Sequence, residues 1–463
     1  MTEATGVLAE IVARKRVDVA ARLGGFGLDS AEPTRRSLKA ALARPGARFI
    51  MEVKRGSPSG GAIRPGADAG ALARAYRGAA DAISVLTDAP YFGGSLEDLR
   101  AVRSEFPGPI LAKDFIVDPR QVAEARLHGA DAVLVILAVL ADEEAAAVMA
   151  AARRLGMDVL VEAHTAGEVK RAVALGAGIV GINNRNLDTM EIDLATTERL
   201  AALVPAGTLV VAESGISGRA DAARLAPFAD AFLVGSSLMR SEDPGEAARA
   251  LAFGRVKVCG ITDGHDCAMA AAHGAAYAGV VMVPNTPRAV TGSQAEAIAG
   301  ASPIPLVGVF RNEKPMQIAH SARALALRAV QLHGEEDALY IRALRGLLPE
   351  ETEIWAAAAV GREMPRPRLG ADRTLFDSQV GGRSGGTGIA FDWSRLEGRA
   401  DLGRSVLAGG LRPANARAAA RVGAFALDIG SGVEMAPGRK DSGRLHAFFE
   451  ALRLPARGEA TCG

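Results

Sequence analysis

Two glycine-ended apolar runs close each half of the chain, and this repeat constrains the fold more than any other feature. The first half contains LVVAESGI followed by AFLVGSSL, and the second contains SVLAGGL followed by AFALDIGSG. The spacing is also repeated, because Gly215 to Gly235 and Gly410 to Gly430 are both 20 positions. Strands seven and eight of a (β/α)8 barrel end in loops of this kind, which hold phosphate groups. The repeat therefore predicts two barrels, each with a phosphate site.

Short apolar runs recur along the whole chain and alternate with alanine-rich segments of helical spacing. This alternation is typical of βαβ units in a parallel sheet. Each half contains eight runs, and we expect strands at residues 48–53, 82–87, 109–114, 132–137, 158–163, 179–184, 209–214, 231–236, 255–260, 278–283, 305–310, 329–334, 353–358, 374–378, 405–410 and 425–430. Two open doubly wound sheets are the alternative, but no G-x-G-x-x-G motif opens either half. The pattern favours an α/β fold of two consecutive (β/α)8 TIM barrels.

The two halves meet within residues 252–255, so the expected domains are 1–254 and 255–463, joined by a short linker. Residues before position 48 have no strand partner, and we expect them to add an N-terminal helical segment to the first barrel. The tail, ARGEATCG, is expected to fray.

Composition excludes several classes of protein. The chain has 463 residues with 54 basic and 53 acidic side chains, and no charge block suggests a nucleic-acid or membrane partner. No apolar run approaches the roughly 20 residues that span a bilayer. Cys259, Cys267 and Cys462 do not make a disulfide framework, which favours a reducing, cytoplasmic setting. No metal cluster, dinucleotide fingerprint or Schiff-base cofactor motif is visible, so we expect no metal and no cofactor.

Charged side chains gather at the carboxyl ends of the strands expected in the first half. Glu52 and Lys54 lie on the same side of strand one, because side chains alternate along an extended strand. Strands three, five, six and seven end in Lys113, Glu162, Asn183 and Glu213. For any one of these residues a structural ion pair is an equal alternative. Five charges from four strands that meet at one barrel mouth nevertheless favour an active site.

The motifs of the first half resemble those of indole-3-glycerol-phosphate synthase, in the family's order. They are EVKRGSPSGG, LAKDF, VEAH, GINNRNL, AESGI and LVGSSLM, and they cover about residues 5 to 250. The resemblance implies that Lys113 is the general acid for ring closure and dehydration, with Glu162 as its proton-transfer partner. It implies that Lys54 holds the substrate carboxylate and that Asn183 contacts the anthranilate part. It also implies two acidic groups that orient the lysines, Glu52 and Glu213, and a phosphate cradle of Ser57, Ser214, Gly215, Gly235 and Ser236.

These implied roles agree with what the reaction needs. A pyrrole ring closes onto the carbon that carries the carboxylate, and carbon dioxide and water then leave, so carbonyl oxygen and departing hydroxide both need an acid. A lysine among carboxylates can be held charged for that purpose. Loss of carbon dioxide is easier when the carboxylate is desolvated by apolar walls. Arg55 and Arg185 stay open between ligand contacts and solvated loop charges.

The second half carries a different pair of reactive groups. Cys259 ends strand one, in KVCGIT, and Asp377 ends strand six on the opposite side of the barrel. A cysteine in an apolar strand is usually inert, but its place at a strand mouth beside a glycine favours a reactive thiolate. The glycine-rich run from Gly381 to Gly388 exposes backbone N–H groups that suit an anion.

KVCGIT, VPNTPRAV, VGVFRN, VQLHG, LFDS with GGTG, AGGL and LDIGSGVE resemble phosphoribosylanthranilate isomerase over about residues 255 to 450. The resemblance implies an Amadori rearrangement with Asp377 as general acid and Cys259 as general base. It implies that Arg288 contacts the anthranilate carboxylate. The remaining binding residues that it implies are Gln331, His333, Gly386, Thr387, Gly388, Gly409, Gly410, Asp428, Gly430 and Ser431. For His333 a structural role is an equal alternative, and Cys267 and Cys462 match no motif.

The two resemblances belong to consecutive steps of tryptophan biosynthesis, because the isomerase product is the synthase substrate. They imply a fused bifunctional enzyme whose partners are small phosphorylated anthranilate substrates. We expect a monomer with two separate sites. One alternative is a fused pair of other phosphosugar barrels, although these usually carry paired aspartates at strands one and five. Another is that one barrel is a catalytically inactive scaffold, which the presence of Lys113, Glu162, Cys259 and Asp377 disfavours.

Overall fold

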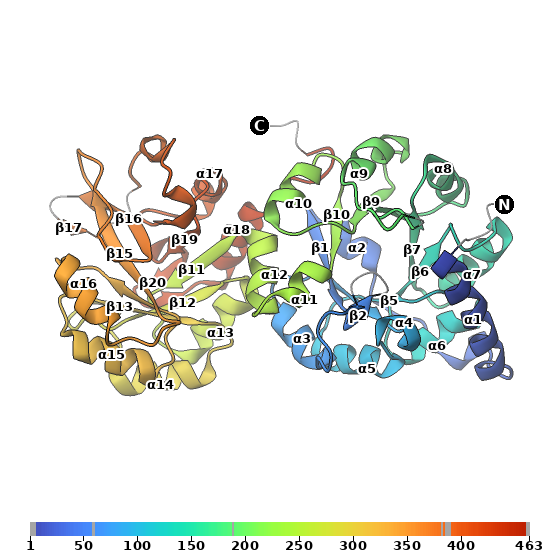
Figure 1. The fold of residues 1–463 in the computed structure, drawn as a ribbon, viewed down its shortest axis with the longest axis horizontal. Helices are drawn as coiled ribbons and strands as arrows, with labels where there is room; N and C mark the ends of the chain where they lie inside the picture. Colours follow the sequence, from blue (N-terminus) through green and yellow to red (C-terminus); the bar gives the residue numbers. More distant parts are fainter. Residues whose placement is uncertain (1–5, 58–60, 188, 381–382, 385–389, 460–463) are drawn as a thin grey trace. The chain divides into compact units, whose positions relative to one another are not determined.

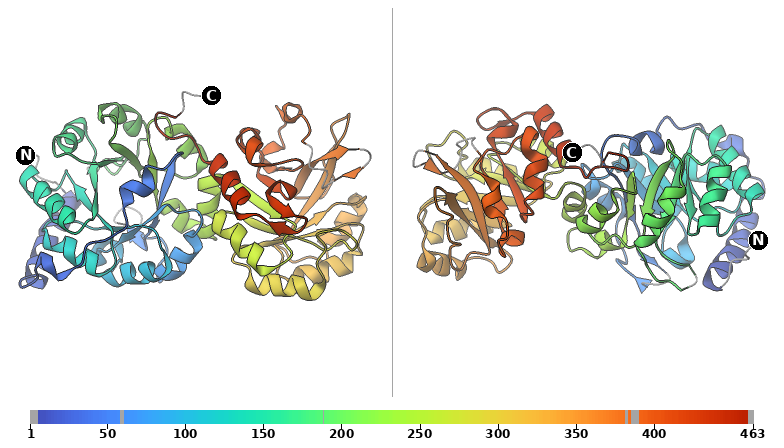
Figure 2. Two further views of the ribbon diagram at one scale, coloured as in Figure 1. Left: turned by 180° about the vertical axis from the view of Figure 1, so that it is seen from behind. Right: turned by 90° about the horizontal axis from the view of Figure 1, so that it is seen from above.

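The chain folds into two compact units, each built around its own barrel (Figure 1). The computed structural model describes residues 6–57, 61–187, 189–380, 383–384 and 390–459. The first unit comprises Met1–Ala252 and Leu454–Gly463, and the second comprises Phe253–Arg453. Two further views show helices packed around the strands of each barrel (Figure 2).

Eight parallel strands close the first barrel, because β1 pairs with both β4 and β10. They are β1 Arg48–Val53, β4 Ala82–Leu86, β5 Ile110–Lys113, β6 Ala132–Ile136, β7 Asp158–Ala163, β8 Ile179–Asn183, β9 Leu209–Glu213 and β10 Ala231–Val234. Each strand overlaps a predicted run. Buried side chains fill the interior, among them Ile50, Leu111, Leu134, Leu160 and Leu233. The predicted barrel is therefore confirmed, and its interior is a packed core.

Helices surround this barrel and also precede it. The chain begins with α1 Gly6–Arg22, η1 Leu28–Ser30 and α2 Leu38–Leu42, which confirms the predicted N-terminal helical segment. The remaining elements are the β2 Gly56–Ser57 and β3 Gly61–Ala62 hairpin, α3 Ala69–Tyr76, α4 Ala89–Phe92, α5 Leu96–Glu105, α6 Arg120–Leu127, α7 Asp142–Arg154, α8 Ala166–Ala174, α9 Ala195–Leu200, η2 Ala201–Leu203, α10 Arg219–Leu225, α11 Ser236–Arg240 and α12 Pro244–Phe253.

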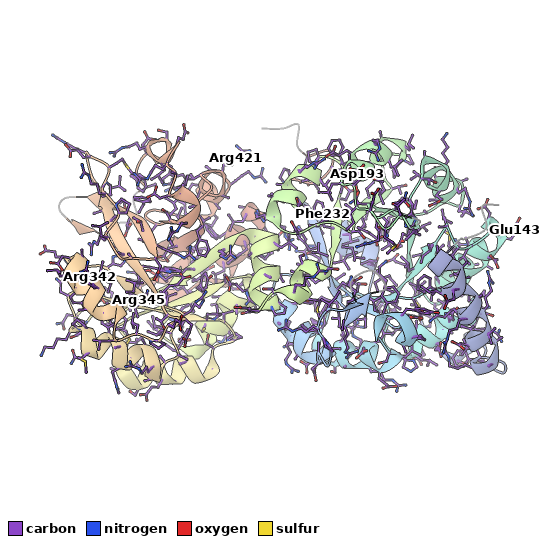
Figure 3. All side chains as sticks on the ribbon, viewed as in Figure 1. Glu143, Asp193, Phe232, Arg342, Arg345 and Arg421 are labelled. Atoms are coloured by element: carbon purple, nitrogen blue, oxygen red, sulfur yellow. The ribbon has the colours of Figure 1, made fainter. Side chains whose placement is uncertain are left out.

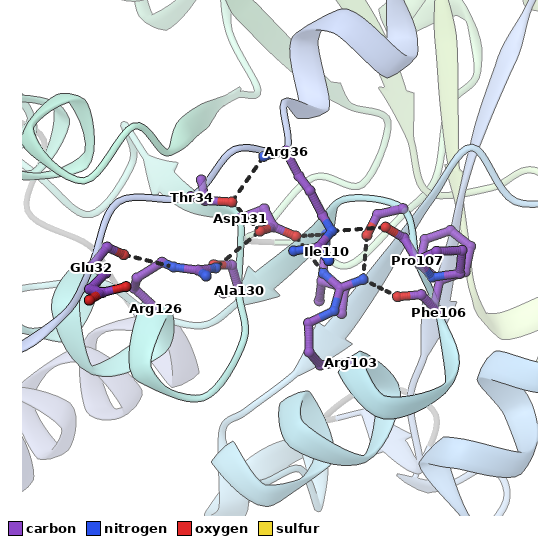
Figure 4. A network of polar contacts seen from close by, with 11 residues as sticks. Glu32, Thr34, Arg36, Arg103, Phe106, Pro107, Ile110, Arg126, Ala130 and Asp131 are labelled. Atoms are coloured by element: carbon purple, nitrogen blue, oxygen red, sulfur yellow. Dashed lines mark hydrogen bonds and ion pairs between the residues drawn. The ribbon is translucent and has the colours of Figure 1, made fainter.

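A buried carboxylate ties the N-terminal segment to the amino-terminal end of the barrel (Figure 4). Asp131, just before β6, has no exposed surface and accepts hydrogen bonds from the Thr34 hydroxyl at 2.5 Å and the Ile110 N–H at 3.1 Å. The guanidinium groups of Arg103 and Arg126 bond to it at 2.7 and 3.0 Å. With its lone pairs satisfied in this way, the buried charge is compensated and fastens the end of the barrel opposite the strand mouths.

The second barrel also has eight parallel strands, closed by pairing of β15 with β16. They are β11 Arg255–Cys259, β12 Tyr277–Val281, β13 Leu306–Phe310, β14 Ala329–Leu332, β15 Glu353–Val360, β16 Arg373–Val380, β18 Val406–Leu407 and β19 Ala426–Ile429. The other elements are α13 Gly264–His273, α14 Gly292–Ala301, α15 Pro315–Ala324, α16 Ala338–Arg345, β17 Arg383–Ser384, η3 Trp393–Leu396, η4 Leu402–Arg404, η5 Pro413–Asn415, α17 Ala416–Arg421, η6 Ser431–Val433, β20 Glu434–Ala436, β21 Arg439–Lys440 and α18 Ser442–Leu452.

The described end of the chain, residues 454–459, departs from the expected frayed tail, whereas residues 460–463 lie outside the described residues. Leu454 accepts a hydrogen bond from the Ala47 N–H at 2.8 Å, directly before β1. The Arg457 N–H donates to the Ala229 carbonyl at 3.1 Å, and the Glu459 carboxylate accepts from the Gly46 N–H. These bonds satisfy backbone groups that would otherwise face solvent, so residues 454–459 form part of the first unit.

Side chains sort by exposure as expected for two globular units (Figure 3). Phe232 on β10 is buried and contacts Phe49 on β1 with 5.4 Å between ring centroids, whereas Glu143 on α7 is exposed. Among the described residues, no helix is both long and apolar enough to cross a membrane.

Candidate active sites

A cavity of about 680 Å³ lies at the carboxyl ends of the strands of the first barrel. Its lining contains nearly all the site residues predicted for this half: Glu52, Lys54, Lys113, Glu162, Asn183, Glu213, Ser214, Gly215, Gly235 and Ser236. The exception is Ser57 in the β2–β3 hairpin, whose side chain lies outside the described part of the structure.

Lys113 stands between two carboxylates at the centre of this cavity. Its Nζ lies 2.9 Å from Glu162 Oε2 and 3.1 Å from Glu213 Oε2. The amide of Asn183 donates to Glu162 Oε1 at 3.1 Å, which fixes the carboxylate plane. A second pair stands beside the first, with Lys54 Nζ at 2.7 Å from Glu52 Oε1. The site therefore holds two ammonium groups and three carboxylates that can exchange protons with a bound molecule.

The surroundings shift the pKa values of the two carboxylates around Lys113 in opposite directions. Burial opposes ionisation of both groups, but the charge of Lys113, followed by that of His164, lowers the pKa of Glu162 below its ordinary value. Burial raises the pKa of Glu213, and the negative charges of Glu162 and Glu52 add to that effect. The carboxylates outweigh burial at Lys113, whose pKa is raised. Groups whose proton affinities are separated in this way suit opposite roles in proton transfer.

Gly181 makes room for one of these carboxylates. A Cβ built on Gly181, in β8, would lie 2.1 Å from Glu213 Oε1. The glycine therefore has a steric reason to be there, which was not predicted from the sequence.

His164 lies behind Glu162 and is a site residue that was not predicted from the sequence. Its Nε2 lies 3.2 Å from Glu162 Oε1, close enough to pair charges although not aligned as a hydrogen bond. Its Nδ1 lies 3.3 Å from Glu168 Oε2, and its backbone N–H donates to the same oxygen at 2.7 Å. Burial lowers the pKa of His164, but the two carboxylates outweigh it and raise that pKa to about 9. The VEAH motif contained this signal, since His164 follows Glu162 by two positions.

The glycine loops after β9 and β10 converge at one end of the cavity. Ser214 has a φ of 65° and Gly215 a φ of 83°, so two successive residues take the left-handed conformation. For a serine this conformation carries strain and is typical of functional sites. The Ser237 hydroxyl donates to the Ile216 carbonyl at 2.9 Å and joins α11 to the β9 loop. Arg240 also lines this cavity and was not predicted as a site residue.

The two arginines left open in the sequence fall into different settings. Arg55 bonds to both Asp98 carboxylate oxygens, at 2.6 and 2.7 Å, and to the Ala67 carbonyl, which is a structural arrangement. Arg185 lines the cavity, and both burial and the charge of Arg240 lower its pKa. Two cations on one wall favour an anionic ligand there.

Helix α1 supplies an apolar wall to this cavity through Leu8 and Ile11. Lys15 fastens the helix, since its Nζ lies 2.7 Å from both Asp88 Oδ1 and Asp114 Oδ1. Asp114 directly follows Lys113, so the N-terminal helix is connected to the strand that carries the central lysine.

The two proton-transfer groups predicted for the second barrel lie on separate strands. Cys259 is the last residue of β11, and Asp377 lies within β16. Cys259 is partly buried and its thiol is free. Burial raises the pKa of this thiol, whereas the Lys257 charge opposes that effect. Asp377 is buried, and this burial, together with the nearby charge of Asp428, raises its pKa to about 6. Gly409 has a φ of 84° and leaves space for Asp377, whose Oδ1 would lie 2.8 Å from a Cβ there.

Gln331, His333 and Asp428 also meet at this barrel mouth. The Gln331 Nε2 lies 2.5 Å from the His333 Nε2, and burial lowers the pKa of His333 to about 3. Gln331 Oε1 and Asp428 Oδ1 are buried and lack a hydrogen-bond partner among the described residues. Unsatisfied buried acceptors are costly, so these two oxygens fit donors on a bound ligand.

Arg288 has a partner that the sequence did not reveal. Its Nε lies 2.9 Å and its Nη2 2.6 Å from the Glu434 carboxylate. Glu434 also accepts from Lys440 Nζ at 2.7 Å, and Lys440 donates to the Cys259 carbonyl at 2.6 Å. Arg288 is therefore held in place by a carboxylate beside the cysteine loop.

The glycine loops of this half are only partly described. Gly409 and Gly410 have φ values of 84° and 66°, and Gly430 and Ser431 stand at the start of η6. The predicted residues Gly386, Thr387 and Gly388 lie outside the described residues. Within the described ranges, no group of three or more His, Cys, Asp or Glu side chains is arranged to hold a metal ion.

Comparison with known proteins assigns both halves. The profile of the family "Indole-3-glycerol phosphate synthase" matches residues 8–251, and that of "N-(5'phosphoribosyl)anthranilate (PRA) isomerase" matches residues 256–451. The "Tryptophan biosynthesis protein TrpCF" of Vibrio cholerae is 45% identical over 415 residues, covering 89% of this chain and 88% of that protein. The protein of the same name from Salmonella typhi is 43% identical, covering 96% of this chain and 99% of that protein.

A solved phosphoribosyl anthranilate isomerase from Thermus thermophilus is 33% identical, covers 43% of this chain and 98% of its own, and has a TM-score of 0.38. The two family matches follow one another in the chain, and the relatives span nearly all of it. The chain therefore belongs to the indole-3-glycerol phosphate synthase family in its first part and to the phosphoribosylanthranilate isomerase family in its second, as a member of the bifunctional TrpCF proteins.

Proposed function

We propose that the chain catalyses two consecutive steps of tryptophan biosynthesis, one in each barrel. The second barrel converts N-(5-phosphoribosyl)anthranilate to 1-(2-carboxyphenylamino)-1-deoxyribulose 5-phosphate, and the first barrel converts that product to indole-3-glycerol phosphate. Membership of both families supports the pair of activities. The single observation that carries the synthase assignment is Lys113 held between Glu162 and Glu213 in a cavity sized for one small molecule.

In the synthase site Lys113 acts as the general acid. It protonates the substrate carbonyl as the aromatic carbon attacks, and later assists loss of the hydroxyl group as water. Glu162, whose Oε2 lies 2.9 Å from the Lys113 ammonium, takes up or returns the proton, while Glu213 and Glu52 hold the lysines. Lys54 pairs with the substrate carboxylate until carbon dioxide leaves.

The remaining cavity residues bind the two ends of the synthase substrate. Asn183 contacts the anthranilate part, and its bond to Glu162 orients both groups. The phosphate lies at the other end, against backbone N–H groups of the loops after β9 and β10, in a cradle of Ser57, Ser214, Gly215, Gly235 and Ser236.

In the isomerase site Asp377 protonates the furanose ring oxygen, and the C1–O bond breaks to give an iminium ion. Cys259 then removes the proton from C2 of the sugar, and the resulting enolamine tautomerises to the ketone. The raised pKa of Asp377, about 6, keeps a larger fraction of this carboxyl protonated near neutral pH than an ordinary aspartate would, which supports its role as general acid.

Arg288 faces the anthranilate carboxylate in this scheme, and Asp428 and Gln331 accept bonds from sugar hydroxyls through their unsatisfied oxygens. His333, which stays neutral, lines the site beside Gln331. The phosphate takes the loops that contain Gly386, Thr387, Gly388, Gly409, Gly410, Gly430 and Ser431.

We assign residues 1–254 to the synthase domain and the chain from residue 255 to the isomerase domain, with the family matches 8–251 and 256–451 in support, except that residues 454–459 pack on the first unit. Both activities proceed without a cofactor in this proposal. The protein works as a monomer in the reducing cytoplasm, a setting that suits the free thiol of Cys259.

Two variants of the full chain test the assignment. Lys113→Ala should reduce the synthase rate at least about a thousandfold and leave the isomerase rate within about twofold, because substitutions in separate barrels with no shared partner usually act independently. Cys259→Ala should give the converse result. Loss of both activities in either variant would show that the sites are not independent, and full synthase activity in Lys113→Ala would remove Lys113 as the acid.

A further inference from the structure

The second barrel contains a buried ammonium group that the chemistry proposed above does not use. Lys257 lies two residues before Cys259 on β11, and alternation along the strand places both side chains on one face. The Lys257 side chain has no exposed surface. Burying a lysine charge is costly even when it is paired, so this charge calls for more than a packing role.

Gly279 shows how closely Lys257 and Cys259 approach each other. It is the register partner of Cys259 on β12. A Cβ built on Gly279 would lie 2.7 Å from Lys257 Cε and 3.0 Å from Cys259 Sγ. Since one point lies this near both atoms, the end of the lysine side chain and the sulfur are neighbours in the space that the glycine leaves open.

Asp428 holds the lysine from the other side. It is the register partner of Lys257 on β19, and its Oδ2 lies 2.8 Å from Lys257 Nζ. The pair fixes the ammonium group laterally, while the thiol stands nearer the strand mouth. Lys257 is thus clamped between a carboxylate on one neighbouring strand and the cysteine on its own.

Two other cations near the thiol, Lys440 and Arg288, share one carboxylate partner, Glu434. Lys440 donates to the Cys259 carbonyl, but its ammonium is paired with Glu434 at 2.7 Å. Arg288 is paired with the same carboxylate.

The charge of Lys257 also reaches the remaining groups of the site. It opposes the effect of burial on the pKa of Asp377 and adds to the lowering of the pKa of His333. It acts in the same sense on Cys259, where burial raises the pKa and the ammonium lowers it. Burial works against the charged lysine itself, but Asp428 and Cys259 outweigh it and raise the pKa of Lys257.

We propose that Lys257 is a positioning residue of the isomerase, whose ammonium group, held by Asp428, stabilises the thiolate form of Cys259. The proposal rests on the proposed function of Cys259 as the base. A thiol must lose its own proton before it can take one from carbon, and an adjacent cation favours that ionised form. During the reaction the sulfur begins as thiolate and ends as thiol by accepting the C2 proton, and Lys257 remains an ammonium ion throughout.

The experiment measures the ionisation of the Cys259 thiol directly, without substrate. In the full chain carrying Cys267→Ala and Cys462→Ala, the rate of alkylation by iodoacetamide is followed against pH, and its midpoint reports Cys259. Lys257→Met should raise that midpoint by at least about one pH unit and lower isomerase kcat/KM at neutral pH at least about tenfold, since one unit is a tenfold change in thiolate. Lys257→Arg, which keeps the charge, should keep the midpoint close to that of the parent chain.

Asp428→Asn makes the test independent of how well Lys257→Met folds. It removes the competitor for the ammonium group, so the midpoint should fall, in the opposite direction to Lys257→Met. If Lys257 had only a structural role, the two substitutions would not shift the alkylation midpoint in opposite directions. An unchanged midpoint in Lys257→Met with normal synthase activity, or an unchanged or raised midpoint in Asp428→Asn, would overturn the proposal.

Failure of the proposed base role is a separate outcome. If Cys259→Ser kept full isomerase activity, Cys259 would not be the base, whereas the alkylation midpoints would still decide whether Lys257 governs the thiol.

Discussion

Gly235 lies directly against the carboxylate of Glu52, because a Cβ built on this glycine would stand 2.4 Å from Glu52 Oε1. The φ of Gly235 is −132°, so alanine meets no backbone strain there and only crowding is tested. Gly235→Ala should displace Glu52 and with it Lys54, which lies 2.7 Å from that oxygen. We expect the synthase kcat/KM to fall about a hundredfold, as for a misplacement near 1 Å, in steady-state assays.

Gly27→Ala is the matched control, since nothing lies within 4 Å of the Cβ it would add. It should keep the parent synthase rate. Normal activity in Gly235→Ala would mean that Glu52 can shift without consequence.

The raised pKa of Asp377 predicts a stability gain from removing its charge. Its folded pKa of about 6 lies above the ordinary value of 3.8, so the ionised carboxylate destabilises the folded state above pH 6, and this cost disappears as the pH falls toward 4. Asp377→Asn should therefore stabilise the second unit by about 2 to 3 kcal/mol above pH 6 and by nothing below pH 4. Isomerase activity should be lost at every pH.

Tryptophan fluorescence measures this second-unit stability selectively. The chain has two tryptophans, Trp355 and Trp393, and both lie in the second unit. Urea denaturation at several pH values gives the difference between parent and variant. A gain that does not depend on pH would exclude the titration of Asp377 as its cause.

His164 predicts a pH dependence of the same direction in the first unit, at higher pH values. Its folded pKa, about 9, lies above the ordinary value of 6.5, so its stabilising contribution is complete below pH 6.5 and is lost as the pH rises through 9. The contribution is at most about 3 kcal/mol. In His164→Gln, the first-unit transition in urea, followed by circular dichroism, should lose most of its dependence on pH in this range. A parent-like slope in the variant would contradict the pairing with Glu162 and Glu168.

Lys15 predicts a long-range effect on substrate binding. Because its ammonium bridges Asp88 and Asp114, Lys15→Met leaves two buried carboxylates without their partner and should destabilise the first unit by about 3 kcal/mol. Looser packing of Leu8 and Ile11 on the cavity should raise the synthase KM more than it lowers kcat. Kinetics of the variant at a temperature well below its unfolding transition check this.

Arg14→Ala provides a control on the same helix. Arg14 forms an exposed ion pair with Asp18 at 3.5 Å, and such pairs contribute little. Equal effects of the two substitutions would indicate a general loss of helix stability and not the loss of the Lys15 bridge.

The hydrogen bonds of residues 454–459 predict that removing the end of the chain destabilises the first unit. Removing residues 454–463 deletes the bonds of Leu454 to Ala47, of Arg457 to Ala229 and of Glu459 to Gly46. A few hydrogen bonds of this kind contribute about 2 kcal/mol, so the first unit should melt about 4 to 8 °C lower. Differential scanning calorimetry should show the second-unit transition unchanged. An unchanged melting temperature of the first unit would mean that bonds to water replace these hydrogen bonds with no loss of stability.

The positions of the strands were predictable because barrel strands are buried on both faces and therefore appear as continuous apolar runs. Every predicted run overlaps an observed strand, from Arg48–Val53 to Ala426–Ile429. Lys113, Glu162 and Glu213 were predictable as neighbours for a related reason: parallel strands of a barrel bring all their carboxyl ends to one mouth.

Side-chain pairing between distant elements was not predictable in the same way. Glu434 holds Arg288 from 146 positions away, and nothing in either local pattern marks the match. In the sequence, Lys257 cannot be distinguished from any other polar residue within a strand. Its closeness to Cys259 becomes visible only in the structure, where Gly279 leaves space for both side chains. The packing of residues 454–459 depends on bonds to backbone groups of the first unit, which no sequence pattern marks, so the place of the segment at the chain end pointed instead to fraying.

The return of the chain end to the first unit has a consequence for biosynthesis. Synthesis proceeds from the amino terminus, so the ribosome completes Phe253–Arg453 before it adds Leu454, the first tail residue that bonds beside β1. The first barrel is thus closed by its own strands early but receives its last backbone partners after the second barrel has been made. In topological terms the isomerase unit is an insertion within the synthase unit, and a gene cut after residue 254 would leave the synthase without its final segment.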